Sequence, residues 1–206
     1  VGTIQDAPID MVHPDMKALF EIATEPIAMV DADKRSEVEN LVMKLKKDGD
    51  STGGIVEVVA TGLPIGLGNP NFDGIENRLA RVIFGVPAIK GVSFGGGFDT
   101  CSRLGSEVND AFTMDGDTIT TTTNNSGGIQ GGITNGLPLI MQVGIKPTPS
   151  IYKEQHSVSL SQKEDTLLTI KGRHDPCVAL RAVPVIEAVT ALVILDFLGD
   201  IDHELR

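Results

Sequence analysis

The apolar run near the C-terminal end most restricts how this chain can fold. From Val183 to Leu198 the sequence is VPVIEAVTALVILDFL, and its only charged residues are Glu187 and Asp196. A helix that is apolar all round is normally buried on every side, so other elements are expected to cover it. Pro184 suits a first helical turn, which predicts a helix from about Pro184 to Leu198. A run of this length, interrupted by two acids, is too short to span a bilayer.

The remaining hydrophobic patterns predict a mixture of helices and strands. Apolar residues recur at helical spacing in DADKRSEVENLVMKLKKDGDS and DGIENRLARVIFGVP, whereas GGIVEVVATGLP, IKGVSFG and LPLIMQVGI are typical of strands. HSVSL and DTLLTIKG are expected to form a hairpin, and Asp115-Gly116 is a turn signal. The first residues, VGTIQDAPI, are interpreted as the middle or end of a strand. The expected elements are helix 31–48, strand 53–64, helix 73–87, strand 89–95, strand 137–145, hairpin 156–172 and helix 184–198.

The order of these elements and the net charge limit the class of protein. The order lacks the regular alternation of a doubly wound sheet, and no linker divides it, so we expect an α+β fold in a single domain over residues 1–206. The formal net charge of −11 argues against a nucleic acid or an anionic membrane as the main partner. A local basic pocket for a small anion is compatible with this charge. Cys101 and Cys177 form no disulfide framework and indicate reduced thiols in a cytoplasmic protein.

Two short stretches suit ligand binding, and each has a purely structural alternative. NNSGGIQGGITNG (124–136) has two glycine pairs, which either let the backbone approach a ligand or only form turns between strands. KPTPS (146–150) places a cation and two hydroxyls in a loop stiffened by prolines. Such a loop suits either a phosphate group or an ordinary surface turn.

A third stretch, GRHDP (172–176), allows two interpretations. Arg173 offers a fork of donors to an anion, and a desolvated Asp175 could act as a base. In the structural alternative Asp175 caps the following helix, Arg173 pairs with an acid and His174 is solvated. No cluster of Cys, His and Asp has the spacing of metal ligands, so no metal site is expected.

Taken together and in this order, NNSGGIQGGITNG, KPTPS and KGRHDPCVALRAVPVIEAV closely resemble the C-terminal signatures of chorismate synthase. KKDGDSTGG, GLPIGLGNPNFDGIENRLA, IKGVSFGGGFD and GSEVND are similar to the same family, so the resemblance covers essentially the whole chain. It implies a β-α-β sandwich of the chorismate synthase type, with helices between antiparallel sheets. It also implies a homo-oligomer, since the family assembles as a tetramer.

The resemblance implies an activity and a cofactor. The family eliminates phosphate from 5-enolpyruvylshikimate 3-phosphate to give chorismate, the last step of the shikimate pathway and a part of aromatic amino acid biosynthesis. This 1,4-elimination has no net redox change, yet it needs reduced FMN. The family is also associated with NADP, although the residues do not identify the source of the electrons that reduce FMN.

Positions that match the family's motifs imply roles for residues of this chain. Asp175 corresponds to the catalytic carboxylate near flavin N5, where it assists proton transfer. The positions that correspond to flavin contacts are Pro87, Ala88, Gly131, Lys146, Pro147, Thr148, Pro149, Ser150 and Arg173.

The chain departs from the family's pattern in one large respect. The signature with a catalytic histidine near the start, a second catalytic histidine, the substrate-binding arginines and an Arg-Ser-Ser-Ala flavin stretch have no counterpart in it. We therefore expect a truncated fold, a C-terminal fragment of a larger chorismate synthase chain that is inactive alone. The alternative is a non-catalytic flavin-binding or assembly module of the same fold.

Overall fold

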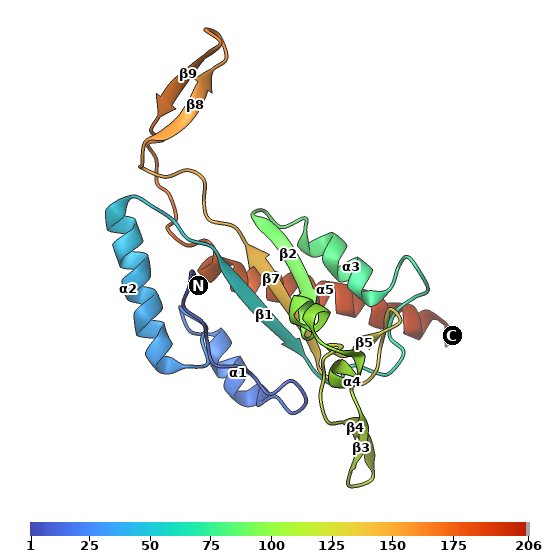
Figure 1. Ribbon diagram of the computed structural model, residues 1–206. Coiled ribbons are helices and arrows are strands. Elements are labelled where there is room, and N and C mark those ends of the chain that lie inside the picture. The colour runs from blue at the N-terminus through green and yellow to red at the C-terminus, as the bar shows by residue number, and fades with distance from the viewer. Residues whose placement is uncertain (205–206) are drawn as a thin grey trace.

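A three-stranded antiparallel sheet, in the order β1-β7-β2, forms the centre of the molecule (Figure 1). The computed structural model describes the backbone of residues 1–204 and the side chains of residues 1–199. Strand β7 lies between its two partners, and five of its seven residues are buried. The strands are β1 (Gly54–Ala60), β2 (Ile89–Phe94) and β7 (Leu139–Ile145).

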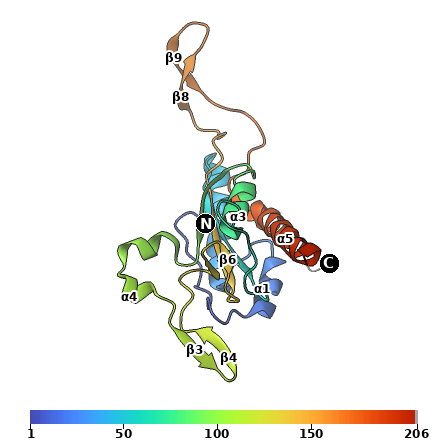
Figure 2. The same cartoon turned by 90° about the vertical axis from the view of Figure 1, so that its right-hand side faces the viewer.

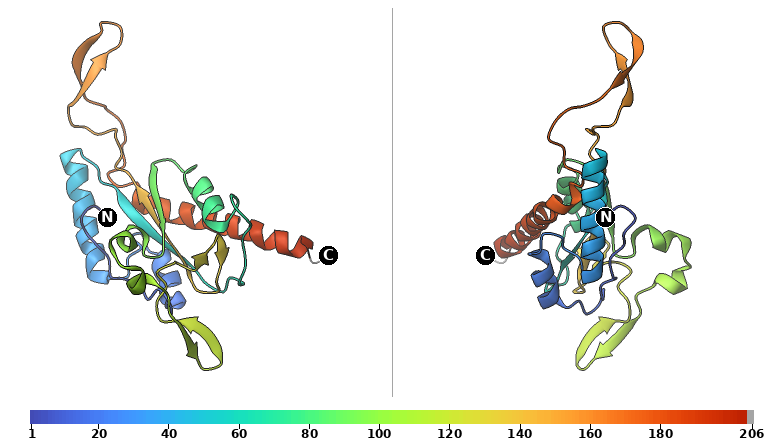
Figure 3. Two further views of the ribbon diagram at one scale, coloured as in Figure 1. Left: turned by 45° about the vertical axis from the view of Figure 1, so that its right-hand side comes forward. Right: turned by 90° about the vertical axis from the view of Figure 1, so that its left-hand side faces the viewer.

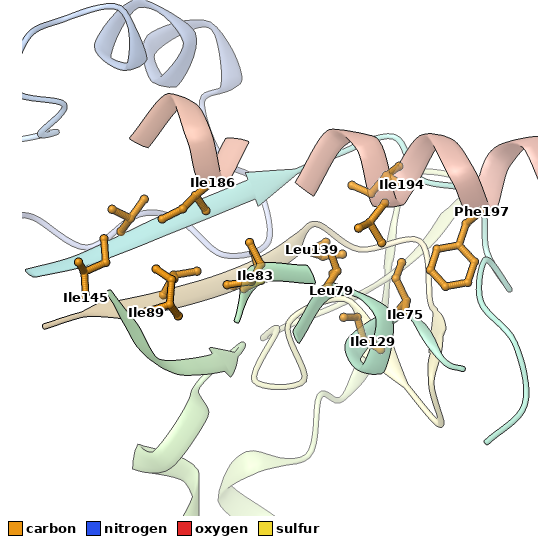
Figure 4. Packing of buried hydrophobic residues seen from close by; sticks show 14 of the residues in the cluster. Ile75, Leu79, Ile83, Ile89, Ile129, Leu139, Ile145, Ile186, Ile194 and Phe197 are labelled. Carbon is orange, nitrogen blue, oxygen red and sulfur yellow. The ribbon is translucent and has the colours of Figure 1, made fainter. Parts of the chain in front are cut away.

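Two helices cover one face of this sheet. Helix α3 (Ile75–Ile83) packs on β2, helix α5 (Ala179–Glu204) packs on β1, and the two helices contact each other. Every fourth residue of α3 is fully buried, which places one apolar stripe against the sheet. The side chains of α3 and α5 that meet over the sheet in Figure 4 include Ile75, Leu79, Ile83, Ile186, Ile194 and Phe197.

The remaining helices lie at the edges of this core. Helix α2 (Ala32–Asp48) lies to one side of the sheet (Figure 1) and confirms the helix expected over 31–48. The short helix α1 (Met16–Ala23) precedes it and was not expected from the sequence. Between β2 and the first projecting hairpin the chain forms η1 (Gly97–Ser102) and α4 (Gly105–Val108).

Two hairpins project from opposite ends of the molecule (Figures 1 and 2). Strand β3 (Phe112–Asp115) pairs with β4 (Thr118–Thr121), and their turn contains Gly116 at a φ of 58°. Strand β8 (Gln155–Ser159) pairs with β9 (Glu164–Leu168). The expected turn and the expected hairpin are therefore both confirmed.

Helix α5 differs from the closing helix expected from the sequence. It begins at Ala179, so Pro184 lies inside the helix and not in its first turn. It continues to Glu204 and runs past the end of the sheet (Figure 3). The expectation that this segment is too short to cross a bilayer was wrong, because Ala179–Gly199 is long and apolar enough to do so. Of its most apolar window 28% is buried inside the structure, and the buried part, which includes Ile186 and Phe197, belongs to the hydrophobic core.

Burial of α5 on every side was also a wrong expectation. Ile186 and Phe197 are enclosed against the sheet and α3, with exposed fractions of 0% and 2%. The opposite face carries Val185, Leu192 and Leu195, which are 45%, 65% and 62% exposed. The helix is apolar all round, but the described elements cover only one of its faces.

The N-terminal residues do not form the strand that VGTIQDAPI had predicted. Residues 1–9 contain a turn and otherwise belong to no helix or strand. A hydrogen bond joins Gly2 N to Gly53 O at 3.0 Å, but the pairing does not continue as a ladder. A single hydrogen bond of this kind does not make a strand.

Candidate functional site

A cavity of about 220 Å³ lies beyond the C-terminal end of β7. Three segments that are distant in the sequence line it, and each contributes polar side chains. The end of α2 and the following turn contribute Lys46 and Ser51, the segment after β7 contributes Ser150 and Tyr152, and the loop before α5 contributes Arg173, His174 and Asp175. Cations, hydroxyls and carboxylates therefore face the same small space.

Backbone hydrogen bonds hold the three segments together. Helix α2 ends at Gly49, whose φ of 66° turns the chain back toward the sheet. The carbonyl oxygen of Gly49 accepts from Tyr152 N at 2.9 Å, and Thr52 N donates to Pro176 O at 2.8 Å. Ser51 Oγ donates to Thr148 O at 2.6 Å. The turn after α2 is thus bonded both to the KPTPS loop and to the loop before α5.

A glycine allows the close approach of β1 to the start of the KPTPS loop. A Cβ atom at Gly53 would lie 2.3 Å from the carbonyl oxygen of Ile145 and 3.2 Å from Pro147 Cδ. Any side chain at this position would push the two segments apart. On the other side of β7, Lys146 N donates to Ala88 O at 3.0 Å. Two segments that were expected to contact the flavin, Pro87-Ala88 and Lys146–Ser150, therefore lie next to each other.

Ala88 adopts a backbone conformation that is unusual for a residue with a side chain. Its φ is 72°, in the left-handed region. Such a conformation costs about 1–3 kcal/mol and persists only where the surrounding structure imposes it. The hydrogen bond that Ala88 O accepts from Lys146 N is one such constraint.

Asp175 caps the start of the segment that leads into α5, as the structural interpretation of GRHDP predicted, and it also lines the cavity. Its Oδ1 accepts from Cys177 N at 3.1 Å, and its Oδ2 forms an ion pair with Arg181 Nε at 2.8 Å. These contacts fix the carboxylate just before α5 begins. Burial raises the pKa of the adjacent Cys177 thiol, so this cysteine remains protonated at neutral pH.

Arg173 and His174 do not behave as the structural alternative predicted. The exposed Arg173 forms no ion pair or hydrogen bond with any residue that the structure describes, whereas pairing with an acid was expected. His174 is half-buried and not solvated, and its Nε2 is enclosed without a hydrogen-bond partner among the described side chains and backbone. Such an atom costs about 1–3 kcal/mol. An unpaired guanidinium beside a cavity is available to a ligand.

The ring of His174 is held between two neighbours. A Cβ atom at Gly172 would lie 2.8 Å from His174 Cε1 and 3.0 Å from Nε2, so the ring packs directly on the glycine. The ring of Tyr152 meets that of His174 edge to face, with centroids 5.3 Å apart and planes at 65°. The hydroxyl of Tyr152 donates to Gly172 O.

Gly131 lies away from the other expected flavin contacts. It occupies the turn between β5 (Ile129–Gln130) and β6 (Ile133–Thr134), before β7 begins. Lys146 follows the end of β7, so the seven residues of that strand separate the two by roughly 20 Å. The structure therefore brings Pro87, Ala88, Lys146–Ser150, Arg173 and Asp175 to one end of the sheet and leaves Gly131 at the other.

The glycine-rich stretch is also anchored by its own polar residues. Asn124 is 2% exposed; its Nδ2 donates to Pro138 O, and its Oδ1 accepts from Gly128 N. The Asp110 carboxylate accepts from Asn125 N at 2.6 Å and from Ser126 N at 3.0 Å. These bonds fix the stretch, which forms turns next to β5 and β6.

The cavity residues that the sequence did not identify as part of a site include Lys46, Asp50, Ser51 and Tyr152. Lys153 Nζ lies 2.5 Å from Asp50 Oδ2, and this bond together with that from Ser51 N lowers the pKa of Asp50. The available signal was the polar run KKDGDST around a glycine. Among the described side chains, no group of three His, Cys, Asp or Glu is placed to hold a metal ion.

Comparisons with known proteins point to one family. The sequence profile of a family described as chorismate synthase matches residues 3–198. Curated relatives named chorismate synthase include those of Dehalococcoides mccartyi, 44% identical over 184 residues, and Crocosphaera subtropica, 47% identical over 188 residues. The matches cover 89% and 91% of this chain but 50% and 52% of the relatives. The chain thus spans about half the length of the curated relatives it matches.

A solved structure supports the same assignment. A crystal structure of chorismate synthase matches with a TM-score of 0.67 and 31% identity, and the match covers 84% of this chain and 45% of that chain. The expected α+β fold of the chorismate synthase type is confirmed over that part.

Proposed function

Because the chain belongs to the chorismate synthase family, we propose that it supplies a flavin-holding part of an enzyme that converts 5-enolpyruvylshikimate 3-phosphate to chorismate and phosphate. One observation carries the proposal for this chain's own residues. The KPTPS loop and the GRHDP loop meet at one cavity, although 27 positions separate Lys146 from Arg173 in the sequence. Hydrogen bonds through the turn after α2 join the two loops before any ligand binds.

The cavity residues fit an anionic cofactor such as FMN. Lys46 and Arg173 supply positive charge, and Ser150 supplies a hydroxyl. Charge-assisted hydrogen bonds of this kind are roughly twice as strong as neutral ones. At about 220 Å³ the cavity is smaller than the sites that enclose whole ligands, so it holds one end of the cofactor.

The residues of this chain bind the cofactor and manage charge beside it. Reduced FMN, when bound, supplies electron density to the reacting centre while phosphate leaves. The unpaired Arg173 neutralises negative charge at the cavity. Cys177 N and Arg181 fix the orientation of the Asp175 carboxyl group at the cavity, where we propose that it assists proton transfer.

Turnover is proposed to need more than this chain. The chain covers about half of its relatives' length, and the catalytic histidines and substrate-binding arginines that the resemblance implies have no counterpart in it. We propose that the chain alone forms no chorismate, and that it functions within a longer cytoplasmic homo-oligomer, a tetramer in the family. NADP has no residue assigned to it here.

Flavin titration tests the cofactor assignment. FMN fluorescence should be quenched as the wild-type chain is added, with weak affinity because the chain supplies only some of the contacts. Arg173→Ala should weaken binding about tenfold or more, since a charge-assisted hydrogen bond contributes about 1.5–3 kcal/mol. Arg81→Ala, on α3 and away from the cavity, removes the same charge and should leave binding unchanged. Equal Kd values for all three chains would remove Arg173 from the site.

An activity assay tests the reaction. The complete protein should release chorismate from 5-enolpyruvylshikimate 3-phosphate with reduced FMN under anaerobic conditions, and the 206-residue chain should not. Turnover by the chain alone would overturn the proposal that other residues are needed. A complete protein that binds FMN but never forms chorismate would favour the alternative, a non-catalytic flavin-binding or assembly module.

A further inference from the structure

Tyr152 joins all three segments that line the cavity. Its backbone N donates to Gly49 O at 2.9 Å, in the turn after α2. Its hydroxyl donates to Gly172 O, and its ring packs edge to face on His174. Tyr152 itself follows the KPTPS loop by two positions. A single residue thereby connects the end of α2, the segment after β7 and the loop before α5.

We propose that Tyr152 is a positioning residue that sets the Arg173 guanidinium against the KPTPS loop. This inference rests on the proposed function, because Arg173 is there the group that meets the anionic cofactor. The hydroxyl of Tyr152 fixes the carbonyl group directly before Arg173, and its ring fixes the residue directly after it. Arg173 has no partner of its own among the described residues, so these two contacts hold its backbone in place.

The local geometry shows why the loop needs this support. His174 packs on Gly172 closely enough to exclude a Cβ atom there, and its Nε2 is buried without a hydrogen bond. Leaving His174 Nε2 buried without a partner is unfavourable, so this conformation of the loop needs support from other segments. Tyr152 supplies such contacts. Gly49 allows Tyr152 to approach, because a Cβ atom at Gly49 would lie 2.7 Å from Tyr152 Cβ.

Hydrogen exchange tests the positioning role without any cofactor. Tyr152→Phe keeps the ring and removes the bond to Gly172 O. We expect faster amide exchange in residues 169–176, unchanged exchange in β1 and β7, and an unchanged melting temperature. Ser157→Ala is the matched control, since it removes a hydroxyl from β8 that forms no hydrogen bond with this loop. Equal exchange at 169–176 in wild type and Tyr152→Phe would overturn the proposal.

A double-mutant cycle with FMN shows whether Tyr152 acts through Arg173. We expect Tyr152→Phe to weaken FMN binding about fivefold in the wild-type background, the effect of one hydrogen bond. In the Arg173→Ala background the same change should alter Kd less than twofold, because the positioned group is gone. Equal effects in both backgrounds would overturn the positioning role. Absence of FMN binding by the wild-type chain would overturn the proposed function, and the exchange experiment would then decide the role of Tyr152 by itself.

Discussion

Asp175 Oδ2 lies 2.8 Å from Arg181 Nε across the start of α5. The same carboxylate accepts a hydrogen bond from Cys177 N. These contacts would be present whether Asp175 only starts the helix or also transfers a proton. The two roles nevertheless differ in what they need: a cap needs an oxygen acceptor, whereas proton transfer needs an ionisable carboxyl.

Two substitutions of Asp175 in the complete protein separate these roles. Asp175→Asn keeps an acceptor for Cys177 N, and Asp175→Ala removes it. We expect both variants to lose turnover by about 10²-fold or more, because neither can exchange a proton. Only Asp175→Ala should lose stability, by about 1 kcal/mol, as the cap is lost. Steady-state kinetics and thermal unfolding measure the two effects.

The control for this prediction is the cofactor. FMN binding should stay within about twofold of wild type in both variants, because the cations and hydroxyls of the cavity are intact. An Asp175→Asn protein with normal turnover would show that Asp175 serves only to begin α5.

Gly53 is expected to be essential for joining β1 to the KPTPS loop. In Gly53→Ala the new methyl group would lie 2.3 Å from the carbonyl oxygen of Ile145. Gly53 directly precedes β1 and Ile145 is the last residue of β7, so neither atom can move without disturbing the sheet. We expect a loss of about 1–3 kcal/mol in the free energy of unfolding, as for other overpacked sites. Gly91→Ala in β2 is the matched control, since no atom lies within 4 Å of its Cβ position. Equal melting temperatures for the two variants would contradict the prediction.

Local sequence patterns predicted most elements of the fold but not the ends of α5. The spacing of apolar residues identified α2, α3 and the strands of the sheet because each buries one face along its own length. Pro184 was placed in the first turn because proline lacks a backbone donor. The actual start is set by Val178 O, which accepts from Arg181 N and Ala182 N. A residue-level rule could not identify that contact.

The candidate site was only partly predictable for a similar reason. Arg173 and Asp175 could be singled out because charged residues before an apolar helix are conspicuous. Ser51 could not, because it meets Thr148 O across 97 positions of sequence. Tyr152 was missed because its role depends on the carbonyl group of Gly172, which carries no side chain to indicate a contact.

Asp110 is expected to stabilise the glycine-rich stretch in a pH-dependent way. Burial works against its ionised form, but hydrogen bonds from Ser126 N, Thr123 Oγ and Asn125 N outweigh that effect and lower the pKa of Asp110. A lowered folded-state pKa adds stability above the unfolded pKa, about 3.9 for Asp, and the gain is lost as the pH falls through the folded value. Wild type should therefore lose this contribution only in acid.

Asp110→Asn measures this contribution. At pH 7 we expect the variant to be less stable by about 1–3 kcal/mol, because bonds to a charged acceptor are lost. Below about pH 4 the difference should shrink, since Asp110 of the wild type becomes neutral as well. Thermal unfolding at several pH values tests this, with Asp117→Asn in the β3–β4 turn as the control for loss of an acid. A difference that is the same at pH 7 and in acid would contradict the assignment.

The outer face of α5 is expected to hold copies of the chain together. Val185, Leu192 and Leu195 lie on one side of the helix and are 45%, 65% and 62% exposed. Burying a leucine contributes about 1.5–3 kcal/mol, so Leu192→Glu with Leu195→Glu should weaken self-association about 100-fold or more. Light scattering at micromolar concentration should show an oligomer for wild type and for Met43→Glu, a 64% exposed position on α2, and a monomer for the double variant. A wild-type chain that is already monomeric, or a double variant of unchanged size, would show that this face does not join the copies.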